Sequence, residues 1–69
     1  MINNTHYNII DALIFAMGKE KLATLYSGWN DNMTIWEYAQ TYSIPSTVAS
    51  VLVECFEFAD QNNWKPWTR

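Results

Sequence analysis

Positively charged residues are scarce in this chain, and none of them lies between Glu37 and Trp64. Four lysines and arginines stand against seven aspartates and glutamates among 69 residues, so the formal net charge is −3. Non-specific affinity for DNA depends on lysines and arginines that displace the counterions of phosphates. The charge balance therefore argues against a nucleic-acid partner and favours a protein partner.

Cysteines and long apolar runs are also nearly absent. Cys55 is the only cysteine, so no internal disulfide can form, as is usual in a reducing cytoplasm. The longest apolar run, IIDALIFAM, covers residues 9–17 and is interrupted by Asp11, whereas a membrane span needs about 20 such residues. The opening residues, MINNTHYN, lack the cation of a signal peptide. We expect a cytoplasmic protein without a membrane partner.

Residues that could perform catalysis or hold a metal are few. A Cys–His dyad would have to use His6 and Cys55, and it needs a third group to orient the base. A metal site needs three or four clustered ligands, and no Gly-rich phosphate loop occurs. We therefore expect no catalytic, metal or cofactor residue and no enzymatic activity. His6 is predicted to lie on the surface and Cys55 to be a buried thiol.

Helical patterns dominate what is present, and we predict an all-α fold. Apolar residues at helical spacing indicate a helix over 5–27, capped by Asn4 or Thr5, with Gly18 either breaking it or tolerated inside it. Two further helices are predicted over 35–43 and 46–61, followed by a tryptophan-containing tail over 62–69. The expected architecture is one domain, residues 1–69, forming a small bundle of three to four helices with a helix-turn-helix-like core.

The second and third predicted helices have clear start signals. Thr34 and Glu37 have the spacing of a capping box, in which each side chain accepts a hydrogen bond from the backbone N–H of the other residue. Pro45 ends the second helix because the residue before a proline avoids helical angles. Ser46 is the predicted N-cap of the third helix.

The third predicted helix carries a narrow polar stripe and is otherwise apolar from 48 to 59. The stripe consists of Thr47, Ser50, Glu54, Glu57 and Gln61. The remaining apolar arc spans about 220°, against the ~100° of an ordinary surface helix. The helix is therefore either the centre of the domain or half of an interface. The second reading favours a homodimer through helix 46–61, with Val48, Val51 and Phe58 as candidate self-association residues.

Residues 34–52, TIWEYAQTYSIPSTVASVL, resemble the helix-turn-helix superfamily. The matching positions are Ala39, Ser43 in place of the usual turn glycine, Ile44, Pro45, and the inward-facing Ala49 and Leu52. The resemblance implies that the helix from Ser46 would be the recognition helix. Such a helix needs side chains that anchor phosphates and read bases, whereas here Glu54 and Glu57 would repel phosphate. The resemblance therefore implies the family's shape and not its usual activity.

Four tryptophans in so short a chain either fill the core or leave part of it for a partner to cover. Trp36 lies within a predicted helix and is expected in the core. Trp29 lies in a polar turn, and Trp64 and Trp67 lie in the tail, which either folds back over the core or exposes them. Tryptophan is prominent among residues that dominate binding energy. We therefore take Trp29, Trp64 and Trp67 as candidate partner-binding residues.

Acidic side chains provide a second set of candidates. Glu54, Glu57 and Asp60 are most simply solvated, and they could also form an acidic patch for a basic groove on a partner. We expect a small acidic interaction protein, similar in style to phage or mobile-element accessory proteins that inhibit or bridge a host protein, such as a defence or transcription factor or a toxin.

The alternative is a compact helix-turn-helix transcriptional regulator. Its base-reading residues would be Ser46, Thr47 and Ser50. If the helix-turn-helix motif instead covers residues 18–37, GKEKLATLYSGWNDNMTIWE, they would be Asn30 and Asn32. Its phosphate contacts would come from Lys19, Lys21, Lys65 and Arg69.

Overall fold

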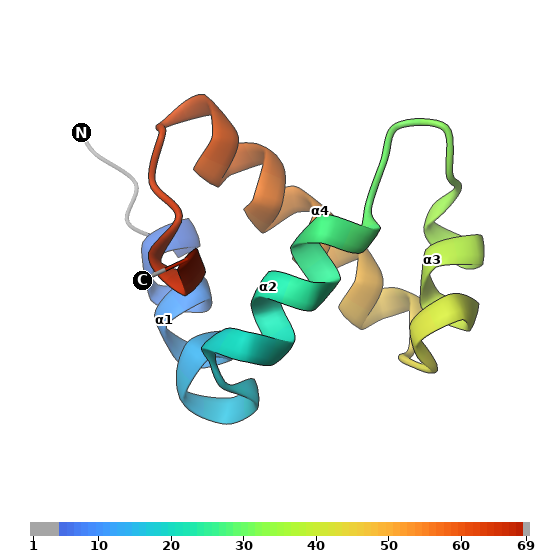
Figure 1. Ribbon diagram of the computed structural model, residues 1–69, viewed down its shortest axis with the longest axis horizontal. Helices are drawn as coiled ribbons and strands as arrows, with labels where there is room; N and C mark the ends of the chain where they lie inside the picture. Colours follow the sequence, from blue (N-terminus) through green and yellow to red (C-terminus); the bar gives the residue numbers. More distant parts are fainter. Residues whose placement is uncertain (1–4, 69) are drawn as a thin grey trace.

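Four α-helices follow one another along the chain. They are α1 (Thr5–Met17), α2 (Lys19–Gly28), α3 (Ile35–Tyr42) and α4 (Ser46–Gln61), and a short 3₁₀ turn, η1 (Pro66–Thr68), follows them (Figure 1). The computed structural model describes residues 5–68, so Asn4 and Arg69 lie outside the described residues. No strand occurs in that range, which confirms the all-α prediction. None of its helices is long and apolar enough to cross a bilayer.

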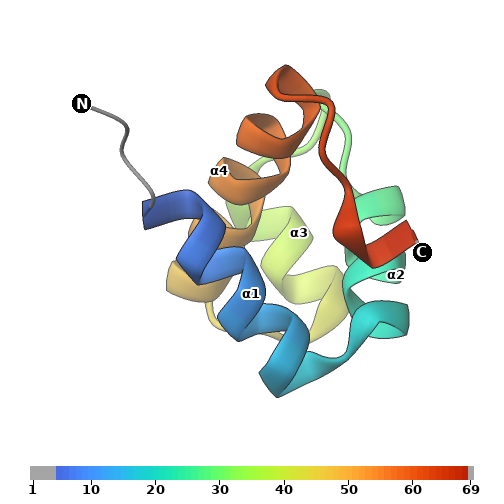
Figure 2. The ribbon, with the colours of Figure 1, turned by 90° about the vertical axis from the view of Figure 1, so that its left-hand side faces the viewer.

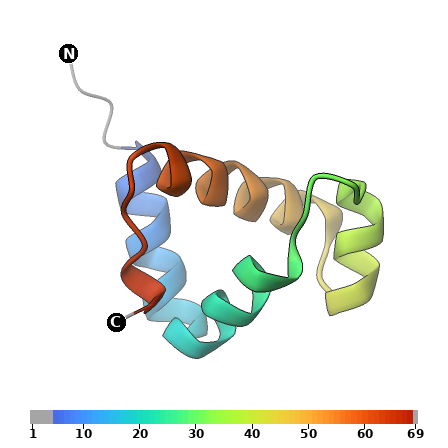
Figure 3. The same ribbon diagram turned by 45° about the horizontal axis from the view of Figure 1, so that its top comes forward.

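The helices form an open frame that side chains fill. Helix α4 runs along one side, α1 and α3 stand near its two ends, and α2 passes opposite it (Figure 3). The tail after α4 turns back and brings η1 against α2 (Figure 2). Helix α1 and the tail with η1 therefore lie at the same end of the molecule (Figure 3).

Gly18 divides the first predicted helix in two. Its φ of 89° and ψ of 152° are far from helical values, and positive φ is readily adopted only by glycine. Its N–H still closes α1 by donating to Ile14, at 2.9 Å, and its carbonyl accepts the first bond of α2 from Leu22, at 3.2 Å. One residue thus ends one helix and begins the next in a new direction.

The start of α3 confirms the predicted capping box. The Glu37 N–H donates to Thr34 Oγ1 at 3.1 Å, and the Thr34 N–H donates to Glu37 Oε1 at 3.0 Å. At the other end Ser43 has φ 56° and ψ 43°, the left-handed conformation in which helices often end. The N–H groups of Ser43 and Ile44 then donate to the carbonyls of Gln40 and Ala39.

Helix α4 starts and ends differently from its neighbours. Pro45, with φ −61° and ψ 145°, is its N-cap, so the prediction that Ser46 is the cap was wrong. Proline suits this site because its carbonyl can accept the first helical bond, from Ala49 at 3.0 Å, without an N–H of its own. Asn63, with φ 51°, reverses the chain after α4, and Trp64 donates back to Ala59 at 3.0 Å.

The wide apolar arc of α4 is explained by its central position. Ala49 and Leu52 face inward as predicted, and Val53, Cys55, Phe56 and Ala59 are buried beside them. Helix α3 and helix α1 pack on different parts of this arc, and Trp67 returns from the tail to cover Phe56. A 69-residue chain can thus bury the wide apolar face of one helix by placing its other segments around that face.

Tyr38 links α3 to the end of α2. Its side chain is completely buried, and its hydroxyl donates to the Leu25 carbonyl, one of the acceptors that the end of a helix leaves free. The ring also meets Trp29 and Tyr42 edge-on, each at 5.2 Å between centroids. Next to it Tyr42 covers Gly28 so closely that a Cβ there would overlap its hydroxyl.

Two large apolar side chains lie outside the core. Trp36 is 63% exposed, so its predicted core position was wrong. At 100° per residue, Trp36 lies about 110° from the centre of the α3 face formed by Ile35, Tyr38, Ala39 and Tyr42. Phe15 is 94% exposed because it lies on the face of α1 opposite Ile10, which is 1% exposed. A helical span rich in apolar residues does not by itself reveal which of them turn outward.

Replacement of Ser43 by glycine is expected to stabilise the protein. Relief of the left-handed conformation outweighs the added chain entropy, so Ser43→Gly should raise the free energy of unfolding by about 0.5–1 kcal/mol and the melting temperature by about 2–8 °C. Ser50→Gly, at an exposed position inside α4, should lower the melting temperature instead. Thermal unfolding followed by circular dichroism compares the two, and effects of the same sign would contradict the reason given.

Removal of the Tyr38 hydroxyl is expected to destabilise the fold and to reduce its sensitivity to alkali. Tyr38→Phe leaves the Leu25 carbonyl unpaired at a cost of about 1–3 kcal/mol. Burial raises the pKa of the Tyr38 hydroxyl above its usual range. The folded state therefore holds this proton more tightly than the unfolded state does. The resulting stabilisation is complete below about pH 10 and is lost progressively as the pH rises above that.

Urea unfolding at about pH 8 and pH 11 measures both effects. Tyr38→Phe should lose less stability between the two pH values than the unmodified protein does. Tyr7→Phe is the matched control, since the Tyr7 hydroxyl forms no hydrogen bond within residues 5–68. An identical loss in all three proteins would contradict the assignment to Tyr38.

Candidate functional site

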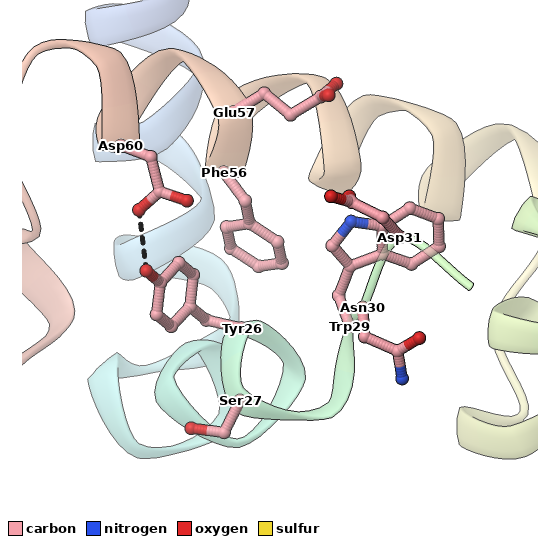
Figure 4. Close-up of a pocket in the computed structure, with 8 residues that line it drawn as sticks. All are labelled: Tyr26, Ser27, Trp29, Asn30, Asp31, Phe56, Glu57 and Asp60. Carbon is pink, nitrogen blue, oxygen red and sulfur yellow. Dashed lines mark hydrogen bonds between the residues drawn. The ribbon is translucent and has the colours of Figure 1, made fainter. Parts of the chain in front are cut away.

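A cleft between the end of α2, the turn after it and the C-terminal half of α4 brings together three of the predicted partner-binding residues. Trp29, Glu57 and Asp60 line it, although they come from two distant parts of the sequence (Figure 4). Its volume is about 420 Å³, within the usual range for ligand sites. The complete lining consists of Tyr26, Ser27, Trp29, Asn30, Asp31, Phe56, Glu57 and Asp60.

Aromatic rings form the base of this α2–α4 cleft. Phe56 points from α4 toward α2 and lies between Tyr26 and Trp29 (Figure 4). Tyr26 meets it edge-on, with 5.4 Å between the ring centroids. The Trp67 ring packs against both, with 5.2 Å between its centroid and that of Tyr26 and 5.3 Å between its centroid and that of Phe56. The base is therefore held from three separate segments of the chain.

Carboxylates surround the aromatic base. Asp31 follows Trp29 in the turn after α2, while Glu57 and Asp60 lie one helical turn apart on α4, and all three are exposed. Tyr26 donates its hydroxyl to Asp60 Oδ1 at 2.6 Å, and this bond, aided by burial, raises the pKa of Tyr26. Within residues 5–68, Asp31 and Glu57 have no ion-pair partner. The rim therefore presents unneutralised negative charge.

One cation already lies at the Asp60 end of the cleft. The Lys65 Nζ is 3.5 Å from Asp60 Oδ1 and 5.6 Å from the centroid of the Tyr26 ring. Contact with the Tyr26 hydroxyl, followed by the charge of Asp60, raises the pKa of the Lys65 ammonium. The arrangement shows that this end accommodates an ammonium group against a ring and a carboxylate.

The two tail tryptophans do not join the cleft lining. Trp67 is only 3% exposed, so its assignment as a partner-binding residue was wrong and the alternative, a tail folded over the core, is correct for it. The physical reason is that its ring packs against both Tyr26 and Phe56. Trp64 is half-buried and packs on Tyr7 of α1, at 4.8 Å between ring centroids.

Glu54 lies on a different surface from the other two acidic candidates. Its Oε1 is 3.9 Å from His6 Nε2 of α1. His6 is half-buried and not fully on the surface as predicted, because its ring stacks on Phe58 at 4.7 Å. The acidic candidates therefore divide between the α1–α4 contact, which holds Glu54, and the α2–α4 cleft, which holds Glu57 and Asp60.

The three self-association candidates are mostly occupied within the chain. Val48 and Phe58 are half-buried against the core, and Phe58 is covered by His6 and by Tyr7, whose ring lies 5.1 Å away. Only Val51, at 38% exposure, remains a large exposed apolar residue on α4. Self-association through α4 stays a prediction, with less apolar surface for it than the sequence suggested.

Several cleft residues were not predicted from the sequence, and Tyr26, Asp31 and Phe56 matter most among them. Tyr26 and Phe56 look like ordinary core positions of two helices, and only their packing shows that they border a cleft. Asp31 lies in a polar turn, where an acidic side chain is most simply solvated, and its closeness to Trp29 in the sequence is the one signal that could have found it. Residues that meet across α2 and α4 have no common sequence pattern, so spacing alone could not have grouped them.

The described residues offer no reactive or metal-binding alternative to this cleft. Cys55 is buried as predicted, and burial, with a smaller effect of the Glu54 charge, raises the pKa of its thiol. Within residues 5–68 no three His, Cys, Asp or Glu side chains gather in a way that could hold a metal ion. Comparisons with protein-family models, curated proteins and solved structures return no match.

Cys55 is expected to resist thiol reagents while the protein is folded. The thiolate is the reactive form, and both burial and the raised pKa keep it scarce. A disulfide-exchange reagent at about pH 8 should modify the native protein at least ~100-fold more slowly than protein unfolded in guanidinium chloride, given a ~5 kcal/mol stability. Equal rates in the two states would contradict the buried position of Cys55.

Proposed function

We propose that this chain is a small non-enzymatic protein-interaction module that binds a basic segment of a partner protein in its α2–α4 cleft. The observation that carries the proposal is the joining of an aromatic base with the carboxylates of Asp31, Glu57 and Asp60. Carboxylates pair with lysine and arginine heads. Aromatic faces attract the same cations and pack against their apolar stems.

The charge distribution supports a basic partner segment. The net charge of −3 favours the approach of a positively charged surface, and Asp31, Glu57 and Asp60 concentrate negative charge at the cleft itself. A module of this kind acts by covering a basic surface or by bridging it to something else. In a phage or mobile element, that action would inhibit or redirect a host defence factor, a transcription factor or a toxin.

The alternative, a compact helix-turn-helix DNA-binding regulator, has weaker support. Glu54 and Glu57 are exposed on the helix that would read DNA. Lys65 lies against Asp60, which reduces what it can offer a phosphate. Helix α4 also buries its apolar residues under α1 and α3, and its exposed residues near the start, Ser46, Thr47 and Ser50, carry no charge.

A labelled peptide of alternating lysine and alanine is the direct probe of the cleft. Fluorescence anisotropy at about 50 mM salt should detect its binding, while a matched glutamate–alanine peptide should not bind. Glu57→Gln should weaken the lysine peptide about three- to tenfold because a rim carboxylate is lost. Glu20→Gln removes the same charge from an exposed position on α2 outside the cleft and should change affinity less than twofold.

Three outcomes would count against the proposal. Equal effects of Glu57→Gln and Glu20→Gln would mean that only net charge attracts the peptide. Failure of the lysine peptide to bind at tens of micromolar would remove the cleft as a basic-segment site. Binding of mixed double-stranded DNA that fades steeply as salt rises would favour the DNA-binding alternative.

A further inference from the structure

Lys65 lies at the end of the cleft, and its backbone is fixed on both sides. Trp64 before it packs on Tyr7, and Trp67 after it is buried against Tyr26 and Phe56. The Lys65 side chain is by contrast 37% exposed, and the Asp60 side chain that it meets is 52% exposed. The lysine head can therefore leave without unfolding the tail that carries it.

The contact that holds the Lys65 head is loose. Its 3.5 Å separation from Asp60 exceeds the 2.7–2.9 Å of a strong charge-assisted hydrogen bond. Water screens a half-exposed pair of this kind, and such pairs contribute little to stability. Asp60 also keeps the shorter, 2.6 Å bond from Tyr26, which holds its carboxylate in place whether or not Lys65 is present. The receiving groups are thus positioned independently of the cation they receive.

We propose that Lys65 is a built-in competitor for the cleft, and that a lysine or arginine side chain of the partner displaces it from Asp60 and the Tyr26 ring. This inference rests on the proposed function. It adds that the partner's main contact is made by one ammonium or guanidinium group at the end of a flexible side chain. Binding exchanges an internal cation for an external one. The resident lysine thereby lowers affinity for weakly basic segments and favours partners with several cations.

Replacement of Lys65 by methionine tests the competition because it keeps an unbranched, flexible side chain of similar length and removes the charge. With the lysine–alanine peptide as probe, Lys65→Met should bind about three- to fivefold more tightly than the unmodified protein at about 150 mM salt. Lys21→Met is the matched control, since it makes the same change in net charge at an exposed position that lies outside the cleft. Circular dichroism checks that each variant is folded.

A second measurement uses the unmodified chain and does not depend on how the variant folds. Because Lys65 Nζ lies 5.6 Å from the centroid of the Tyr26 ring, the ring should shift the proton signals of the Lys65 side-chain CH₂ next to Nζ. These signals should move toward free-lysine values as the peptide is added. Those of Lys21 should stay unchanged.

The outcomes separate this inference from the function on which it rests. Binding of the peptide with equal gains for Lys65→Met and Lys21→Met, or with unmoved Lys65 signals, overturns the competitor while the cleft remains a basic-segment site. Weaker binding by Lys65→Met also overturns it. Absence of peptide binding by the unmodified protein and by Lys65→Met overturns both proposals.

Discussion

The hydrogen bond from the Tyr38 hydroxyl to the Leu25 carbonyl is the contact on which the arrangement of helices depends. It satisfies a carbonyl at the end of α2 with a donor from α3, inside a core that water does not reach. The same ring holds Trp29 edge-on and thereby fixes one wall of the α2–α4 cleft. Because the turn between α3 and α4 has only three residues, fixing α3 against α2 also determines where the start of α4 lies.

At the other end of the molecule the tail links α2 to α4, as Tyr38 links α2 to α3. The ring of Trp67 packs against both Tyr26 and Phe56, and the hydrogen bond from Tyr26 to Asp60 joins α2 to α4 directly. The aromatic base of the cleft is thus part of the core, while its carboxylates remain in water. A binding surface made this way requires no charge to be buried.

The distribution of exposed apolar residues sets the limits of the interaction surface. Helix α4 looked half uncovered in sequence, yet α1, α3 and the tail cover its apolar face, and Val51 is its only exposed large apolar side chain. The most exposed large apolar residues are instead Phe15 of α1, which faces away from Ile10, and Trp36 of α3, which faces away from Tyr38. Single exposed apolar side chains are common on monomeric proteins and need no partner.

Local signals in the sequence determined the helices of this protein. The Thr34–Glu37 capping box and the proline at 45 act within a few residues of themselves, so the start and the end of α3 could be read directly, whereas the sequence left open whether Gly18 breaks the first helix. The polar stripe of α4, with the inward Ala49 and Leu52, was equally legible. Sequence also supplied Trp29, Glu57 and Asp60 as candidates, but without grouping them.

Tertiary structure alone decided what those candidates became. Whether Trp67 is buried and Trp36 exposed depends on which faces of distant helices need filling, and so does the pairing of Lys65 with Asp60. The closeness of Tyr26 to Phe56 and of Trp29 to Tyr38 joins residues of different helices. Helical period fixes the angle of a side chain about its own axis but not where that axis lies, so the cleft could be known only from the fold.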